Sequence, residues 1–232
     1  MAKPVCAIVG IGPGNGAALA RRFAADHRVA LLSRSAELSA QLVDEIGDAA
    51  AFPCDASDTA SMETALDQAS ADLGDIDTLI YNAGSGSWGT VEDITPAQFE
   101  ASWRVNALGL LAASQRVIPT MKRKGSGAIV VIGATASRRG AARTTAFAPA
   151  KAAQRSLCEA MAKHIWPLGI HVALIIIDGV VDLPRTRLAM PDKPDEFFVK
   201  PADVAATAHW LVNQPRSAWS FEVEARPFGE RW

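Results

Sequence analysis

Short apolar runs alternate with longer segments of helical periodicity along the whole chain. Each run is four to six residues long and consists almost entirely of apolar or β-branched residues, which is typical of strands buried on both faces of a sheet. The predicted strands are Val5–Gly10, Arg28–Ser33, Ala49–Cys54, Thr78–Tyr81, Ala128–Gly133, Val172–Ile177 and Phe221–Ala225.

Helices are predicted between these runs, at residues 14–26, 36–47, 58–73, 95–123, 145–166 and 201–213. The pairs Thr95-Pro96 and Lys200-Pro201 mark two helix starts, because proline is favoured in the first turn. Strands and helices that alternate in this order form a parallel sheet with right-handed crossovers. The pattern therefore predicts an α/β fold, with a doubly wound parallel sheet of seven strands and helices on both faces.

Composition favours a single domain over residues 1–232, because 49% of the side chains are apolar and neither a repeat nor a linker divides the chain. One long irregular segment, Asp178–Val199, is rich in Pro, Asp, Arg and Lys. It follows a strand end, where α/β sheets bind ligands. We therefore predict a substrate-binding lid at residues 178–200, and a plain surface excursion is the alternative.

The charge balance and the cysteine positions indicate which kinds of partner and which cellular compartment to expect. The 23 basic and 25 acidic residues give a net charge of −2, which argues against a nucleic-acid partner. The histidines lack metal-ligand spacing, so no metal site is expected. No apolar stretch reaches the ~18 residues of a membrane span. Cys6, Cys54 and Cys158 are far apart in apolar sequence and are interpreted as buried thiols, which indicates a cytoplasmic protein.

A glycine-rich turn joins the first predicted strand to the first predicted helix. Such a turn lets a pyrophosphate approach the backbone at the helix N-terminus, where N–H groups are unpaired. The context of strand, turn and helix predicts a dinucleotide site, and a turn without a ligand is the alternative. The residues concerned are Gly10, Gly12, Gly14, Asn15 and Gly16.

The end of the second strand indicates which dinucleotide is bound. An NAD-binding protein usually presents a carboxylate there to the ribose 2′-hydroxyl. This chain has Ser33 and Arg34, a hydroxyl and a guanidinium that suit a 2′-phosphate. NADP(H) is therefore the preferred cofactor and NAD(H) a possible one, unless Arg34 is an ordinary surface residue.

Motif order identifies a family. With these glycines, Tyr81-Asn82-Ala83-Gly84, Asn106 within a Val-Asn-Ala-Leu-Gly segment, and Lys151, the chain resembles the short-chain dehydrogenase/reductase family over almost its whole length. The resemblance implies a Rossmann-type domain that binds NAD or NADP, oxidises alcohols or reduces carbonyls, and forms dimers or tetramers. It also implies further cofactor contacts, at Asp55 and Ala56 for the adenine, at Asn82, Ala83 and Gly84 in the cleft, and at Gly179 and Val180 for the nicotinamide amide.

The resemblance further implies a tetrad of asparagine, serine, tyrosine and lysine, of which this chain keeps Asn106 and Lys151. Phe147 stands where the family has its tyrosine acid or base, and Ala134 where it has the serine that polarises the substrate oxygen. Leu183 likewise replaces a threonine expected near the nicotinamide.

Other hydroxyl groups are poor substitutes for the missing pair. Tyr81 is the only tyrosine, and its place at a strand end predicts packing and not catalysis. Thr135 follows Ala134 and either polarises a carbonyl or packs in a loop.

Two functions follow from these patterns. One is an NADP(H)-dependent oxidoreductase that acts on a small organic substrate despite the incomplete tetrad, for example by reduction of a conjugated double bond. The other is a catalytically impaired NADP(H)-binding sensor or structural protein.

A homodimer or homotetramer is expected through the helices at 95–123 and 145–166, which are apolar on more than one face. Aromatic and thioether side chains either line a substrate pocket or belong to the core, namely Trp88, Trp103, Met190, Phe197 and Phe198.

Overall fold

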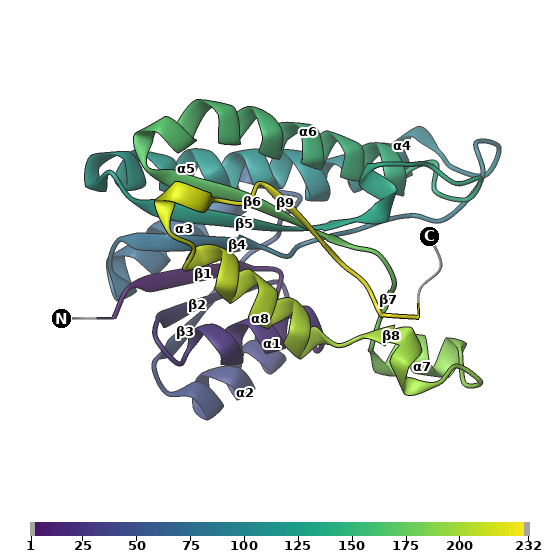
Figure 1. Ribbon diagram of the computed structural model, residues 1–232, viewed down its shortest axis with the longest axis horizontal. Coiled ribbons are helices and arrows are strands. Elements are labelled where there is room, and N and C mark those ends of the chain that lie inside the picture. Colours follow the sequence, from purple (N-terminus) through teal and green to yellow (C-terminus); the bar gives the residue numbers. More distant parts are fainter. Residues whose placement is uncertain (1–2, 230–232) are drawn as a thin grey trace.

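The structure is a computed structural model that describes residues 3–229. Its centre is a parallel sheet of seven strands in the order β3-β2-β1-β4-β5-β6-β9 (Figure 1). The α/β fold with a doubly wound seven-stranded sheet is therefore confirmed. The strands are β1 Val5–Val9, β2 Arg28–Ser33, β3 Ala49–Pro53, β4 Ile76–Tyr81, β5 Gly127–Ala134, β6 Ile170–Ile177 and β9 Glu222–Ala225.

Burial differs between the middle and the edges of this sheet. The central strands are buried on both faces as predicted, and every residue of β1 and β6 is buried. Strands β3 and β9 are only partly buried, because each has one neighbour and lies at an edge. The expectation of strands buried on both faces was therefore wrong for these two.

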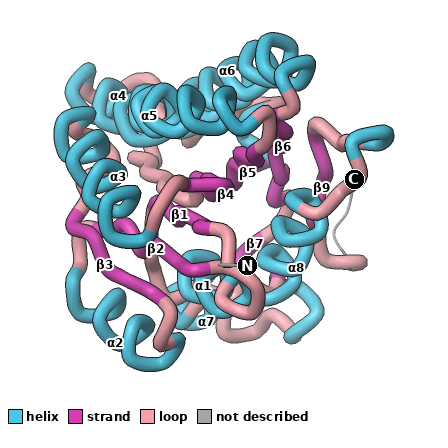
Figure 2. The backbone as a smooth tube through the Cα atoms, turned by 90° about the vertical axis from the view of Figure 1, so that its left-hand side faces the viewer, coloured by secondary structure: helices cyan, strands magenta, loops and turns pink. Residues whose placement is uncertain are grey.

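Helices cover both faces of the sheet (Figure 2). One apolar core lies between the sheet and α3, α5 and α6, and the other between the sheet and α1, α2 and α8. This arrangement brings the carboxyl ends of all seven strands to one edge of the sheet, where α/β proteins bind ligands. The helices are α1 Asn15–Phe23, α2 Ala36–Ile46, α3 Thr59–Leu73, α4 Pro96–Trp103, α5 Gly109–Lys124, α6 Phe147–Ile165 and α8 Pro201–Val212.

The predicted single helix at 95–123 is two helices joined by a π-helical turn. Helix α4 begins at a capping box, in which the Thr95 hydroxyl accepts from the Gln98 N–H and the Gln98 side chain accepts from the Thr95 N–H. The π-helical turn Arg104–Leu108, here called the π-turn, then leads into α5. The apolar periodicity continues through it, which explains why the pattern predicts one helix. Turns of this kind often occur at functional sites, and this one carries Asn106.

The segment predicted as irregular, Asp178–Val199, contains regular structure. Strand β7 Val180–Val181 pairs with β8 Phe198–Val199, and helix α7 Pro184–Ala189 lies between them. Asp182 accepts hydrogen bonds from Arg187 and Lys200. These bonds hold its pKa well below the usual range of a carboxyl group. The strands are two residues long and the ion pairs join separate parts of the segment, so local composition did not indicate this order.

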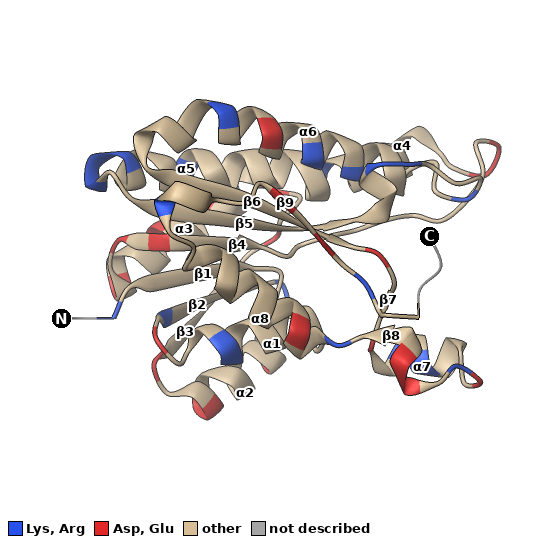
Figure 3. Cartoon of the chain, in the orientation of Figure 1, with Lys and Arg blue, Asp and Glu red and all other residues tan. Residues whose placement is uncertain are grey.

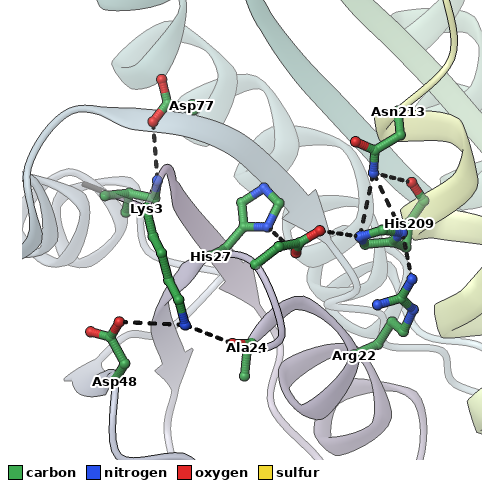
Figure 4. A network of polar contacts seen from close by, with 10 residues as sticks. Lys3, Arg22, Ala24, His27, Asp48, Asp77, His209 and Asn213 are labelled. Atoms are coloured by element: carbon green, nitrogen blue, oxygen red, sulfur yellow. Dashed lines mark hydrogen bonds and ion pairs between the residues drawn. The ribbon is translucent and has the colours of Figure 1, made fainter. Parts of the chain in front are cut away.

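A polar network ties α1 to α8 beneath the sheet (Figure 4). Arg22 contacts Nδ1 of His209, whose Nε2 lies 2.7 Å from an Asp26 oxygen. Because Arg22 is always a donor, Nδ1 accepts and Nε2 carries the hydrogen bonded to Asp26. His27 contacts the other Asp26 oxygen at 2.6 Å. Partial burial alone would raise the pKa of Asp26, but the bonds to His209 and His27 lower it. The network therefore fixes α8, which directly follows β8.

No helix in the part of the chain that the structure describes is long and apolar enough to cross a membrane. The three cysteines are buried and unpaired, as predicted.

Candidate active site

The glycine turn after β1 crosses close over the end of β4. Gly10 has a φ of +97°, and a Cβ atom there would lie 2.5 Å from the Ala83 nitrogen. The Asn82 amide donates to the Gly10 carbonyl oxygen at 2.7 Å and holds the two chain segments together. Only glycine satisfies both the positive φ and the close approach. Gly12 faces open space instead, because a Cβ atom there would have no other atom within 4 Å.

Helix α1 begins directly after this turn, and no side chain caps its N-terminus. Gly14 is its N-cap residue. The Asn15 Oδ1 atom is buried without a hydrogen-bond partner in the described residues. A Cβ atom on Gly16 would lie 2.7 Å from the Gly10 carbonyl oxygen, so this position also requires close backbone contact. Unpaired N–H groups and the helix dipole make this end suitable for an anion such as a pyrophosphate.

The residues predicted for the adenosine end follow β2 and β3. The Ser33 hydroxyl contacts the Ser35 carbonyl oxygen and the Ser39 hydroxyl, both at 2.8 Å. Arg34 is exposed, and within residues 3–229 it forms no ion pair or hydrogen bond. Its guanidinium is therefore available to a ligand.

Asp55 and Ala56 lie next to this end, in the loop after β3. The backbone and hydroxyl groups of Ser57 donate to Asp55 Oδ1 and lower the pKa of that carboxyl group, with a smaller contribution from the charge of Arg34. The Ala56 carbonyl oxygen packs against Gly109 at the start of α5, where a Cβ atom would lie only 2.2 Å away. Close packing of this loop on α5 fixes the ionised carboxylate of Asp55 after the end of β3.

Lys151 and Asn106 meet at Gly84. A Cβ atom on Gly84 would lie 3.5 Å from the Lys151 Nζ atom and 3.6 Å from the Asn106 Oδ1 atom. The Asn106 amide donates to the Ser85 and Ser102 carbonyl oxygens, while its Oδ1 is buried without a partner in the described residues. This unpaired acceptor and the nearby ammonium leave room for a ligand hydroxyl group between them.

Lys151 is buried, with 5% of its surface exposed. Its ammonium donates to the Ile132 carbonyl oxygen at 3.1 Å and to Gln154 Oε1 at 2.9 Å. Removal from water lowers the pKa of Lys151 to about 8. We refer to Gly84, Asn106, Lys151 and Gln154 as the Lys151 cluster. Sequence reasoning missed Gln154, although a second polar residue on the buried face of α6, beside Lys151, was an available signal.

Phe147 begins α6, one helical turn before Lys151. Its ring lies 5.1 Å from the ring of Trp88, measured between centroids, and packs directly against Gly86. Ala134 ends β5 opposite Ile177 of β6. Neither side chain carries a hydroxyl group, so these two positions have no proton to give.

The hydroxyl groups of Thr135 and Tyr81 are already engaged. Thr135 donates to Asp178 and lies within hydrogen-bond distance of the Ile177 carbonyl oxygen, so its single proton serves the protein. Tyr81 is fully buried and donates to the Val105 carbonyl oxygen, which confirms that its phenol is packed. Burial also raises the pKa of Tyr81 well above its usual value.

Gly179 and Val180 lie where β6 leads into the segment 178–200. Gly179 has a φ of +153°, and a Cβ atom there would meet Pro227 at 2.7 Å. Asp178, directly before it, forms an ion pair with Arg226 at 2.8 Å. Figure 3 shows acidic positions along β9 followed by a basic one in the chain beyond it. This part of the site is therefore held by an ion pair to Arg226, directly after the C-terminal strand.

Leu183 of the segment 178–200 contacts the glycine turn. Leu183 packs so closely on Gly14 that a Cβ atom there would lie 2.2 Å from Leu183 Cδ2. Among the proposed pocket residues, Phe198 is buried against Phe197 and the Arg187 guanidinium. Trp88, Trp103 and Met190 are exposed by 62%, 41% and 37%. Phe198 is thus a core residue of the segment, whereas the other three remain accessible.

A surface cavity of about 370 Å³ lies at the start of α6, lined by residues that include Ser137, Thr144, Ala148 and Ala152. No member of the Lys151 cluster lines it, although its lining residue Ala148 directly follows Phe147. Within residues 3–229, no group of three or more His, Cys, Asp or Glu residues is placed to hold a metal ion.

Residues 4–193 match the short chain dehydrogenase family. The chain is 31% identical over 228 residues to the 7alpha-hydroxysteroid dehydrogenase of Escherichia coli strain K12, covering 92% of this chain and 89% of that protein. It is 31% identical to a short-chain dehydrogenase from Rhodopseudomonas palustris, with a TM-score of 0.84 and coverage of 97% and 99%. An alcohol dehydrogenase from Thermococcus sibiricus, complexed with 5-hydroxy-NADP, has the same fold at 24% identity, a TM-score of 0.85 and 98% coverage of both chains.

The chain therefore belongs to the short-chain dehydrogenase/reductase family, as its motifs predicted. It is accordingly an oxidoreductase of the NAD(P)-dependent class.

Proposed function

We propose that this protein is an NADP(H)-dependent oxidoreductase that acts on a small organic substrate with only two of the family's four active-site side chains. The observation that carries the proposal is the convergence of Lys151 Nζ and Asn106 Oδ1 at Gly84, beside Phe147 and Ala134, which carry no hydroxyl group. An intact ammonium and amide favour a bound cofactor, and the apolar pair limits the chemistry.

The described residues fit a dinucleotide at both ends of the cleft. The glycine turn and the uncapped N-terminus of α1 suit the pyrophosphate, and the unpartnered Asn15 Oδ1 and Asn106 Oδ1 atoms need donors that a ligand brings. Arg34 is free to pair with a 2′-phosphate, which favours NADP(H) over NAD(H). Asp55 and Ala56 would border the adenine, Asn82 to Gly84 the cleft, and Gly179 with Val180 the amide of the nicotinamide.

A bound nicotinamide supplies or accepts the hydride. The chain's own residues then determine what happens to the substrate oxygen. Lys151 has three donors, of which Ile132 and Gln154 take two. The third is available to a ribose hydroxyl group or to charge that develops nearby. Phe147 fills the place of the family's tyrosine, and Ala134 that of its serine, without a proton to give.

Loss of a positioned acid usually slows a reaction about 10²–10⁴-fold. Substrates that need no proton on oxygen in the slow step should therefore react best. Conjugated double bonds are one such class, because the proton reaches carbon and water can supply it. Carbonyl reduction should be slow.

Two features of the assembly belong to the same proposal. The segment 178–200 acts as a lid, a role supported by the contact of Leu183 with Gly14 at the mouth of the cleft. The protein forms a homodimer or homotetramer through α4, α5 and α6, where Phe99 and Trp103 are each 41% exposed.

Turnover tests the proposal. The protein is incubated with NADPH and a panel of ketones, aldehydes and enones, and loss of reduced nicotinamide is followed by absorbance. Oxidation of NADPH with an enone, and much slower oxidation with ketones, is the expected result. Tight NADPH binding without turnover of any substrate would support the sensor or structural role instead. Absence of NADPH binding would contradict both.

A further inference from the structure

We propose that Gln154 is a positioning residue, whose buried amide holds the Lys151 ammonium against the π-turn that carries Asn106. This inference rests on the proposed function for its meaning, but the contacts themselves are independent of any ligand. Gln154 has no exposed surface. Its Oε1 accepts from Lys151 at 2.9 Å, and its Nε2 donates to the Asn106 carbonyl oxygen at 3.0 Å.

The orientation of this amide is determined by its neighbours. With the amide reversed, Nε2 would face the ammonium, and two donors would be opposed. Oε1 would then face the Asn106 carbonyl, and two acceptors would be opposed. Gln154 can therefore link the two groups in one way only. The link joins α6 to the π-turn across 48 positions of sequence.

The hydrogen bond from Lys151 to Gln154 also determines which N–H of Lys151 faces the proposed cofactor site. An amide accepts at oxygen and donates at nitrogen, but it does not readily pass a proton from one to the other. The bonds to Ile132 and Gln154 therefore end inside the protein. The third N–H remains on the side of Gly84 and Asn106 Oδ1. Gln154 thus directs the single free donor of Lys151 toward the proposed cofactor site.

The groups around Lys151 allow the role of Gln154 to be measured through the titration of Lys151. The Ile132 carbonyl group of β5, which accepts from the ammonium, is uncharged, and so is the Asn106 side chain nearby on the π-turn. The titratable neighbour is Cys158 on α6, and burial raises the pKa of that thiol to about 12. Cys158 is therefore neutral near pH 8. A change at residue 154 should then dominate any change in the titration of Lys151.

The test is the titration of Lys151 in the cofactor-free protein, followed by NMR through its 13Cε resonance, which is assigned from its loss in Lys151→Met. Gln154→Leu removes the acceptor of a charge-assisted hydrogen bond and should lower the midpoint by about one pH unit, a tenfold change in proton affinity. Gln154→Glu supplies a carboxylate and should raise it by at least as much. Gln214→Leu is the matched control, since Gln214 also bonds through both amide atoms but to Ser220, away from the site.

Midpoints that stay within a few tenths of a unit in both Gln154 variants would overturn the proposal. If Gln154→Leu does not fold, the Gln154→Glu variant decides alone. NADPH affinity is then measured against pH in each folded variant, and its midpoint should shift in the same direction as that of Lys151. Failure of the original protein to bind NADPH would refute the proposed cofactor but would leave the Lys151 titration as a valid test of Gln154.

Discussion

At the residue scale, the candidate site combines retained charges with lost hydroxyl groups. Lys151 and Asn106 remain in contact distance of one backbone position, Gly84, and both keep unused hydrogen-bonding capacity. Phe147 packs against Gly86 and Trp88. This combination explains why we expect cofactor binding to persist while proton transfer is impaired.

Arg34 should determine the choice between the two dinucleotides. Because it forms no hydrogen bond or ion pair among the described residues, it can pair with a 2′-phosphate without first breaking another contact. Arg34→Ala should weaken NADPH binding roughly 10–100-fold and leave NADH binding almost unchanged. Fluorescence titration measures both affinities, with Arg123→Ala at the far end of α5 as the control. Equal affinity of the unmodified protein for the two cofactors would refute the NADP assignment.

As the pH rises, the titration of Lys151 should increase the free energy of unfolding and decrease the affinity for NADPH. Its folded-state pKa of about 8 lies below the ordinary 10.5. Between these values the unfolded chain binds more protons, so the contribution of Lys151 to stability increases with pH. In urea unfolding, the stability of the original protein relative to Lys151→Met should therefore increase between about pH 8 and pH 10. NADPH affinity of the original protein should instead fall above pH 8, as the ammonium loses its charge. A stability difference independent of pH would contradict this account.

At the element scale, the glycines of the turn have different roles: Gly10 is required by the backbone packing, whereas Gly12 faces the proposed ligand. Gly10→Ala forces a Cβ atom into the backbone of Ala83 at a positive φ and should cost roughly 1–3 kcal/mol of stability. Gly12→Ala meets open space, so it should leave stability almost unchanged while weakening NADPH binding at the turn. Denaturant unfolding and cofactor titration of the two variants test the distinction. Equal losses of stability would show that the turn is not built as described.

The elements of the fold were predictable to different degrees. The five inner strands follow from short apolar runs, because strands in the middle of a parallel sheet are buried on both faces. The π-turn did not, since it changes hydrogen-bond register without interrupting the apolar pattern. Strands β7 and β8 did not either, because two-residue strands carry no periodicity and depend on Asp182 and its distant partner Lys200.

The residues of the candidate site were also predictable to different degrees. Glycine spacing and Lys151 were visible in the sequence, because each requires a particular residue at a particular place. The contact of Gln154 with the π-turn was not, since it joins residues 48 positions apart. Likewise, only the structure reveals that the Thr135 proton is already donated to Asp178.

At the scale of the whole molecule, the sheet is enclosed by helices on both faces, yet α4 leaves Phe99 and Trp103 partly exposed one turn apart. Neighbouring exposed aromatic side chains are common on surfaces that a second chain covers. Light scattering at micromolar concentration should therefore give a mass of at least twice the 24.5 kDa of one chain. The pair of changes Phe99→Glu and Trp103→Glu should reduce that mass to the monomer value. A monomeric original protein would contradict the proposed assembly.

The most direct test of the account restores both missing hydroxyl groups and measures carbonyl reduction. The original protein and the double variant Ala134→Ser with Phe147→Tyr are each given NADPH and a set of ketones and aldehydes, and NADPH oxidation is followed over time. A missing hydrogen-bond donor of this kind commonly costs ~3–4 kcal/mol. We expect very slow reduction by the original protein and a clear increase in the double variant, where the phenol lies one turn from Lys151. Reduction of ordinary ketones by the original protein at about 10 s⁻¹, a rate typical of enzymes, would show that another group supplies the proton.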